Sequence, residues 1–311
     1  MKLIEVSESA RRLSGRLQLA ALALPPAVRG MMWMAAAGLT FTLLNTLMRG
    51  MSFTMNPLQI GFLRYVCGLL IVLPLMLRVG LAGMVPHSVG GQFWRGAVHT
   101  SGMLLWFTAL PHIPLADNVA IGFTSPIFIM LGASLFLGEK LVWARWAAAA
   151  FGFVGVLIVV GPSLQLGSGG WYYPLLMLGS SPLFAASFLI VKALTRRDKA
   201  EVIVLWQSIT VALFLCPFAL WDWTWPTGPQ WALLMVCGVF GSLGHYFSTR
   251  ALRAADASAT QGVKFVDLVW ASVAGMIAFG EYPSTTTVLG GLVIFLSTTW
   301  IARREARRRV A

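Results

Sequence analysis

Ten long apolar runs constrain the fold of this chain more than any other feature. Each is roughly 20 residues long, which is what a helix needs to cross a bilayer core of about 30 Å. Only 11% of the residues are charged, whereas a soluble domain carries about 25%. The sequence therefore predicts an all-α polytopic membrane protein. The ten expected spans cover residues 30–49, 57–77, 92–110, 115–137, 143–161, 171–192, 202–221, 229–250, 257–279 and 284–302.

The positive charges predict how these spans are oriented. If alternate connections lie on alternate sides, 20 of the 23 Lys and Arg residues share the side of the two tails. Arg49 alone lies on the other side, and Arg64 and Lys264 fall within spans. Positive charge marks the cytoplasmic face, so we expect both termini to be cytoplasmic in a bacterial-type inner membrane. A signal peptide ending near residue 24 is the alternative reading of the N-terminal tail.

The same distribution accounts for the net charge of +12, which is an orientation signal and does not indicate nucleic-acid binding. Cys67, Cys216 and Cys237 lie in apolar runs without metal-ligand spacing. The chain contains no G-x-x-x-x-G-K-[ST] loop that would hold nucleotide phosphates. We therefore predict no metal, no cofactor and no resident nucleotide-driven pump.

An internal repeat divides the ten spans into two sets of five. A shift of 142 residues aligns the halves without a gap, and Ala109-Leu110 and Gly138-Glu139 then meet Ala251-Leu252 and Gly280-Glu281. Since five is odd, the second half enters the membrane from the opposite side. This predicts an inverted-topology repeat, an architecture of secondary transporters in which the substrate site lies near the midplane between the repeats.

The repeated stretches resemble the EamA-type modules of the drug/metabolite transporter superfamily. The matching features are Ala109-Leu110 followed by the P-x-A-D of 114–117, Pro126, and a Gly-Glu pair with a Gly-rich span after it in each half. The resemblance covers about residues 30–302. One departure is Leu268, which stands where the first half has Pro126 and makes a symmetric kink uncertain.

The resemblance implies ten helices in two inverted repeats and the export of small metabolites across the inner membrane. The family's cargoes include amino acids, their analogues and toxic organic compounds. The expected division of the chain is a basic tail 1–29, repeats 30–162 and 163–302, and a basic tail 303–311.

The strongest site candidates are the charges inside the ninth span. Lys264 and Asp267 are three residues apart, so one continuous helix would place them on one face. Lys264 could bind a substrate carboxylate, pair with Asp267 or extend toward the cytoplasm. Asp267 is too short to reach water from the midplane, so we expect it to be paired, protonated or beside a water-filled cavity. In its protonated form it could carry coupling protons. In the first half Gly122 and Ser125 occupy these two positions, so the charge is asymmetric.

Other polar and aromatic residues within the spans are further substrate-binding candidates. Each has a plain structural alternative: carbonyl or headgroup contacts for the arginine, helix-to-helix bonding for the amides, and core packing for the rings. These candidates are Arg64, His99, His245, Trp106, Trp270, Tyr246, Asn45 and Gln261.

Pro126 and Pro182 interrupt the fourth and sixth spans, where each removes a backbone donor. They could be hinges for alternating access or static kinks. Gly138-Glu139 and Gly280-Glu281 are expected to be structural: the glycine ends a helix, and the glutamate favours the N-terminus that follows.

Together these features predict a secondary transporter that exports small organic metabolites, most plausibly amino acids or analogues, by alternating access. A drug or other metabolite exporter and an uptake carrier are the alternatives within the class. A membrane enzyme would need convergent nucleophile, base or metal groups, which the sequence does not display, and a non-transporting helper is the remaining alternative.

Overall fold

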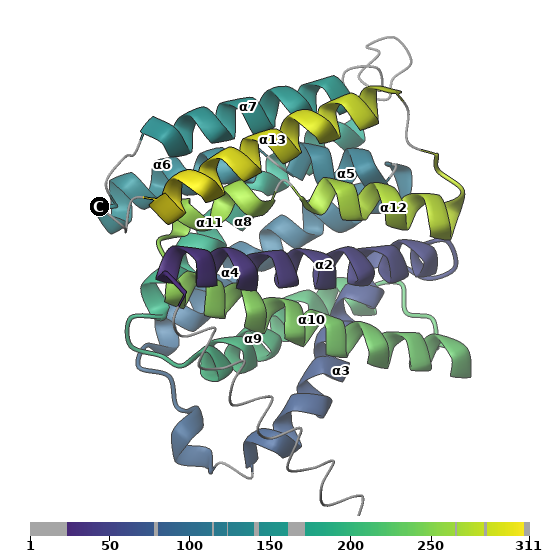
Figure 1. Cartoon of the computed structure of the whole chain (residues 1–311). Helices are drawn as coiled ribbons and strands as arrows, with labels where there is room; N and C mark the ends of the chain where they lie inside the picture. Colours follow the sequence, from purple (N-terminus) through teal and green to yellow (C-terminus); the bar gives the residue numbers. More distant parts are fainter. Residues whose placement is uncertain are drawn as a thin grey trace, which may run out of the picture.

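The computed structural model describes residues 24–77, 80–113, 115–122, 124–139, 143–160, 172–264, 266–282 and 285–307. Every regular element in these ranges is helical (Figure 1). The first repeat supplies α2 (Pro26–Ser52), α3 (Pro57–Leu77), α4 (Val89–Ala109), α5 (Leu115–Gly122), α6 (Ser125–Leu137) and α7 (Trp143–Val160). The second supplies α8 (Tyr172–Leu194), α9 (Ala200–Leu220), α10 (Gly228–Ala254), α11 (Ala257–Lys264), α12 (Asp267–Phe279) and α13 (Thr285–Arg307).

Several of these helices suit a bilayer by length and composition. Among the described residues, α2, α3, α8, α9 and α10 are each long and apolar enough to cross a membrane alone. The count of ten crossings and the cytoplasmic placement of both termini remain predictions.

Two expected spans differ from the prediction because each is broken in the middle. Residues 115–137 form α5 and α6, and residues 257–279 form α11 and α12. The breaks are equivalent under the 142-residue shift. Pro126 stands in the first turn of α6, just after the first break, yet the second break forms with Leu268 at the matching position. The symmetric interruption therefore does not depend on proline.

Equivalent helices of the two repeats make equivalent contacts. The shift between the repeats maps α2 onto α8 and α4 onto α10, and the extensive contacts include the equivalent pairs α2–α10 and α8–α4. Both pairs are antiparallel. Phe41 meets His245 in the middle of α2 and α10, while Gly30 near the start of α2 meets Ala251 near the end of α10. In Figure 1, α7 and α13 lie together at the top, with the broken helices beneath them.

One helix crossing brings two backbones into direct contact. A Cβ on Gly238 of α10 would lie 2.6 Å from the Gly68 nitrogen and 2.9 Å from the Cys67 carbonyl carbon of α3. Small residues permit such close approach between membrane helices. This crossing joins the two repeats, since α3 belongs to the first and α10 to the second.

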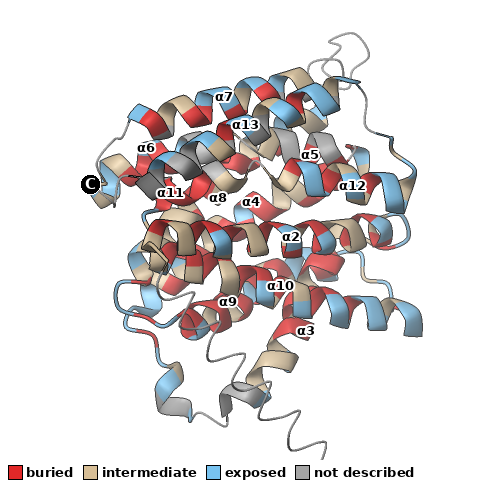
Figure 2. Ribbon diagram, viewed as in Figure 1, coloured by how far each residue is buried: buried red, intermediate tan, exposed pale blue. Residues whose placement is uncertain are grey.

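Burial follows the packing of the helices (Figure 2). Large apolar side chains such as Phe107, Leu44 and Leu215 are almost fully buried where helices meet. Others, including Phe136 and Ile277, are 79% and 77% exposed on the outside of the bundle. An apolar outer surface of this kind suits contact with lipid.

The two Gly-Glu pairs tie the repeats together. Gly138 and Gly280 end α6 and α12 with φ of 66° and 68°, a left-handed conformation that favours glycine. The sequence predicted that each glutamate would serve the N-terminus that follows it. In the structure, Glu139 accepts a hydrogen bond from the Ala257 amide that starts α11 (2.8 Å), and Glu281 accepts one from the amide that starts α5 (3.4 Å). A carboxylate is favourable at a helix N-terminus, so each repeat stabilises the broken helix of the other.

Glu281 also pairs with Arg49 of α2. The two guanidinium nitrogens donate to its two carboxylate oxygens at 2.7 and 2.9 Å. The arginine that sequence analysis placed alone on its side of the membrane is therefore 7% exposed and paired across the repeats.

Candidate functional site: a cavity between the two broken helices

The two helix breaks face one central cavity. α11 ends at Lys264 and α12 begins at Asp267, so these charges do not share the face of a continuous helix, as the sequence had suggested. They lie at a helix C-terminus and N-terminus, where the helix dipoles favour a cation and an anion respectively. Their repeat equivalents, Gly122 and Ser125, line the same cavity. At these two equivalent positions, only the second repeat carries charge.

The cavity has a volume of about 210 Å³ and a largely apolar lining of methionines and aromatic rings. Polar groups are set into this lining at a few points. The aromatic and methionine residues are Met34, Phe41, Met48, Met103, Trp106, Met177, Phe184 and Phe188; the polar and charged ones are Asn45, Arg64, His99, Asn118, Ser125, Ser180, His245, Lys264 and Asp267. Such a wall, apolar with sparse polar groups, is typical of a small-molecule site.

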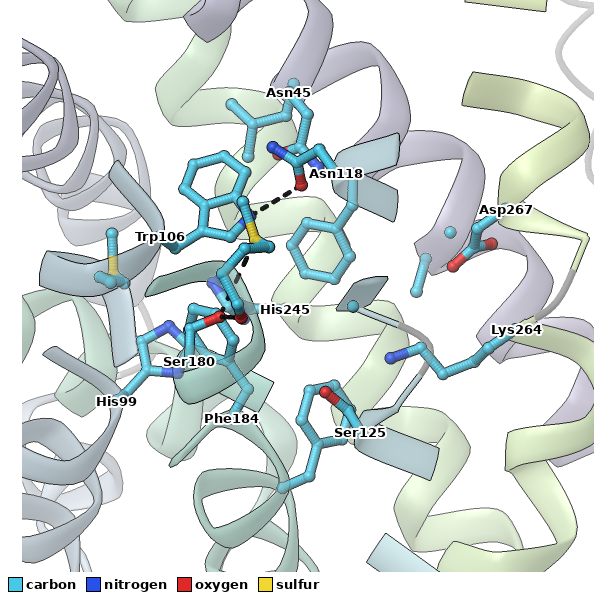
Figure 3. A pocket seen from close by; sticks show the side chains of 18 of the residues that line it. Asn45, His99, Trp106, Asn118, Ser125, Ser180, Phe184, His245, Lys264 and Asp267 are labelled. Carbon is cyan, nitrogen blue, oxygen red and sulfur yellow. Dashed lines mark hydrogen bonds between the residues drawn. The ribbon is translucent and has the colours of Figure 1, made fainter. Parts of the chain in front are cut away.

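The Lys264 and Asp267 side chains approach different groups (Figure 3). The Lys264 ammonium lies 4.7 Å from the centroid of the Phe188 ring, a cation–π contact. The Asp267 carboxylate packs against Gly38 of α2, where even a Cβ would overlap it. Within the described residues, its Oδ1 atom is buried without a hydrogen-bond partner. Asp267 therefore brings to the cavity lining a carboxylate with one unsatisfied oxygen.

Arg64 brings a second cation to the lining. Its guanidinium lies 4.0 Å from the centroid of the Tyr65 ring and close to the Cα of Gly241. The residue is only 6% exposed, and its Nε has no hydrogen-bond partner among the described residues. A buried cation with unused donor capacity suits an electron-rich group on a cargo.

A polar network behind this wall connects the two repeats. The Tyr65 hydroxyl lies 3.2 Å from Nε2 of both His99 and His245. The Gln207 amide nitrogen lies 3.2 Å from the same His245 atom and 3.4 Å from the Tyr65 hydroxyl. Ser187 of α8 lies 3.2 Å from Nδ1 of His99. Both histidines line the cavity, so the network fixes the positions of two of its side chains.

Arg95 anchors this network. Its position inside a helix corrects the charge count made from the sequence. The count placed Arg95 in a cytoplasmic connection, but it lies inside α4 and is 3% exposed. It donates to the Ile203 carbonyl of α9 at 3.0 Å and to Oε1 of Gln207. The residue falls within the apolar run 92–110, so counting by helix position would have identified it.

The structure gathers most of the predicted site residues but not all. Asn45, Arg64, His99, Trp106, His245, Lys264 and Asp267 line the cavity. Tyr246 lies outside it, because it follows His245 on another face of α10 and bonds Glu201 and Arg250. Gln261 donates to the Ala257 carbonyl within α11, and Trp270 is 37% exposed on α12. Tyr65 and Ser187 were not predicted, since nothing local distinguishes them from core residues.

The two candidate hinges stand in different settings. Pro126 lies next to the break before α6, while α8 continues as a helix through Pro182. Ser125 donates to the Ser181 carbonyl at 3.2 Å, which joins the two proline regions across α6 and α8. A hinge role remains a prediction for both prolines.

Two broken helices meet at a central cavity within a duplicated frame of apolar membrane helices. This combination defines a multi-pass membrane transporter of small molecules. The chain belongs to the EamA-like transporter family, whose model matches residues 28–161 and again 171–303.

Curated relatives extend over almost the whole chain. It is 35% identical over 285 residues to a riboflavin transporter of Rhizobium johnstonii, covering 91% of this chain and 93% of the relative. An S-adenosylmethionine uptake transporter of Rickettsia prowazekii is 24% identical (92% and 96% covered), and a pseudopaline exporter of Pseudomonas aeruginosa is 28% identical (89% and 96%). One solved crystal structure shares the fold with a TM-score of 0.69 at 18% identity, covering 89% of this chain and 99% of that one.

Proposed function

We propose that this chain is a secondary transporter for riboflavin or a similar planar heteroaromatic metabolite, carried through the central cavity by alternating access. The observation that carries the proposal is the lining of that cavity. Rings and methionines such as Trp106, Phe184 and Met103 surround it, and isolated polar side chains interrupt them. A flat ring system with hydrogen-bonding edges complements such a wall.

The relatives support this cargo over S-adenosylmethionine. Three of them, named as riboflavin transporters, are 29–35% identical to this chain, whereas those named for S-adenosylmethionine uptake are 24–26% identical. The names of the relatives include both uptake and export, so they do not favour either direction. Rocking of the interlocked repeats around the cavity would expose it to each side in turn.

An amino acid or analogue, the cargo predicted from the sequence, is the second candidate. One specific observation favours it: Lys264 and Asp267 bring opposite charges to the same cavity. A zwitterionic cargo could place its carboxylate on the lysine and its ammonium on the aspartate.

A competition assay separates the two candidates. Proteoliposomes containing the purified chain would be loaded with unlabelled riboflavin and assayed for counterflow of labelled riboflavin. Riboflavin should compete, while a panel of amino acids and S-adenosylmethionine should not. Counterflow of labelled amino acids in the absence of riboflavin counterflow would instead support the second candidate. Accumulation inside or outside cells that overproduce the chain would then give the direction.

We further propose that Asp267 carries the coupling proton, because its carboxylate is buried beside the cavity with an unsatisfied oxygen. Asp267→Asn cannot exchange a proton but keeps a similar shape. We expect this variant to retain downhill counterflow and to lose stimulation by an imposed pH gradient. Asp222→Asn is the matched control, because Asp222 is exposed in the connection before α10. A gradient response in Asp267→Asn equal to that of the wild type would rule out this role.

A further inference from the structure

We propose that the side-chain amide of Asn118 is a fixed hydrogen-bond donor that selects cargoes carrying a ring carbonyl, and that Trp106 sets its orientation. This inference rests on the proposed function, because it assigns a subsite to the same cavity. Neither the charge pattern nor the repeat points to Asn118. Its role follows from the hydrogen bonds that the structure forms and from one that it leaves unmade.

The orientation of the amide follows from simple chemistry. Nε1 of the Trp106 indole lies 3.0 Å from Asn118 and can only donate a hydrogen bond. The Asn118 atom that faces it must therefore be the carbonyl oxygen Oδ1. The amide nitrogen Nδ2 is left on the other side, where it can only donate. The hydrogen bond from Trp106 thus fixes which way the Asn118 amide is turned, and so fixes the direction in which its nitrogen donates.

That donor is buried and unused. Asn118 is 3% exposed and lines the cavity, and its Nδ2 has no hydrogen-bond partner among the described residues. An unpaired polar group in a buried place is unfavourable, so a cargo that supplies an acceptor there is favoured over one that does not. The isoalloxazine ring of riboflavin carries two carbonyl oxygens on one edge, which are acceptors of this kind.

The repeat equivalent of Asn118 shows that the arrangement is not a general feature of the fold. Thr260 occupies that position in α11, is fully buried, and donates to the Ala257 carbonyl of its own helix at 2.8 Å. It is absent from the cavity lining, whereas Asn118 is part of it. The donor therefore belongs to one half of the site, as the charges of Lys264 and Asp267 belong to the other.

These two halves define how a cargo would lie. Figure 3 shows Trp106 and Asn118 on one side of the cavity and Lys264 and Asp267 on the other. A carbonyl edge would meet the Asn118 donor, and hydroxyl donors, such as those of a polyhydroxy side chain, would meet the free Asp267 acceptor. The two ends of the cavity thus recognise opposite hydrogen-bonding characters.

The test compares riboflavin with analogues in which sulfur replaces the oxygen at ring position 2 or 4, because a thiocarbonyl is a weaker acceptor. Binding to the purified full-length protein would be measured by ligand-induced thermal stabilisation and by counterflow. We expect the wild type to prefer riboflavin over at least one analogue by roughly tenfold, the scale of one buried hydrogen bond. Asn118→Asp keeps the acceptor for Trp106 but removes the donor. It should lose roughly tenfold in riboflavin affinity and lose the preference over the analogue.

Two further variants separate this role from a structural one. Trp106→Phe frees the amide to rotate, so the preference should shrink although Asn118 is intact. Asn45→Asp introduces the same charge into the same cavity from α2 and should keep the oxygen-over-sulfur preference. Melting temperature in the absence of ligand shows which variants are folded.

The outcomes are distinct. Folded Asn118→Asp protein with an undiminished preference for riboflavin over both analogues would overturn the subsite while leaving the proposed function in place. Wild-type protein that neither binds nor moves riboflavin would overturn the proposed function and the subsite together.

Discussion

Replacing Gly122 with phenylalanine is expected to reduce transport to background while leaving the fold intact. Gly122 is the last residue of α5 and lines the cavity directly before the first break. A Cβ added there meets no atom of the described residues within 4 Å, so a larger side chain enters open space among them. Because the cavity is only about 210 Å³, a phenylalanine ring would occupy much of the room that a flat cargo needs.

Gly291→Phe is the matched control for this variant. Gly291 of α13 also has no neighbour within 4 Å of an added Cβ in the described part of the chain, but it borders a separate apolar pocket between α12 and α13. The two substitutions add the same volume to a helical glycine in open space. Counterflow should disappear in Gly122→Phe and persist in Gly291→Phe, with similar melting temperatures. Full activity of a folded Gly122→Phe protein would show that the cargo takes another route.

Gly238→Val is expected to prevent stable folding. The added side chain would press on the Gly68 nitrogen and the Cys67 carbonyl carbon, which are backbone atoms and cannot move aside without shifting α3. Overpacking typically costs about 1–3 kcal/mol, and a clash with backbone belongs at the upper end, near 3 kcal/mol. The loss would weaken the α3–α10 crossing, which joins the two repeats.

Thermal unfolding in detergent, followed by size-exclusion chromatography, measures this effect. Gly90→Val is the control, because no atom of the structurally described residues lies within 4 Å of a Cβ added to Gly90, near the start of α4. We expect that control to unfold close to the wild-type temperature and Gly238→Val to aggregate or unfold well below it. A Gly238→Val protein as stable as the wild type would mean that α3 and α10 can separate freely.

Much of the site could be predicted because a charged side chain within a membrane span must face a partner, protein or a water-filled cavity. Lys264, Asp267 and Arg64 stood out as charges within apolar runs, and all three line the cavity. The repeat also indicated that the fourth and ninth spans would correspond. The three charged residues could be predicted as site residues because a charged side chain is unfavourable within a membrane span.

Other parts of the site depend on contacts that no local pattern encodes. The second break forms without a proline, at a place where the Asp267 carboxylate fits against Gly38 from a helix far away in the sequence. Arg95 looked like an orientation signal because it lies near a span end, yet it anchors a network that joins α4 and α9. The free donor of Asn118 is defined only by the position of the Trp106 indole.

The central claim is that this chain moves a riboflavin-like molecule through the cavity between its broken helices. Counterflow of labelled riboflavin in proteoliposomes tests it most directly, with wild type and Gly122→Phe reconstituted at equal density. The wild type should show a transient accumulation of label above equilibrium, and Gly122→Phe should match protein-free liposomes. Absence of accumulation in the wild type, or equal accumulation in both proteins, would contradict the account.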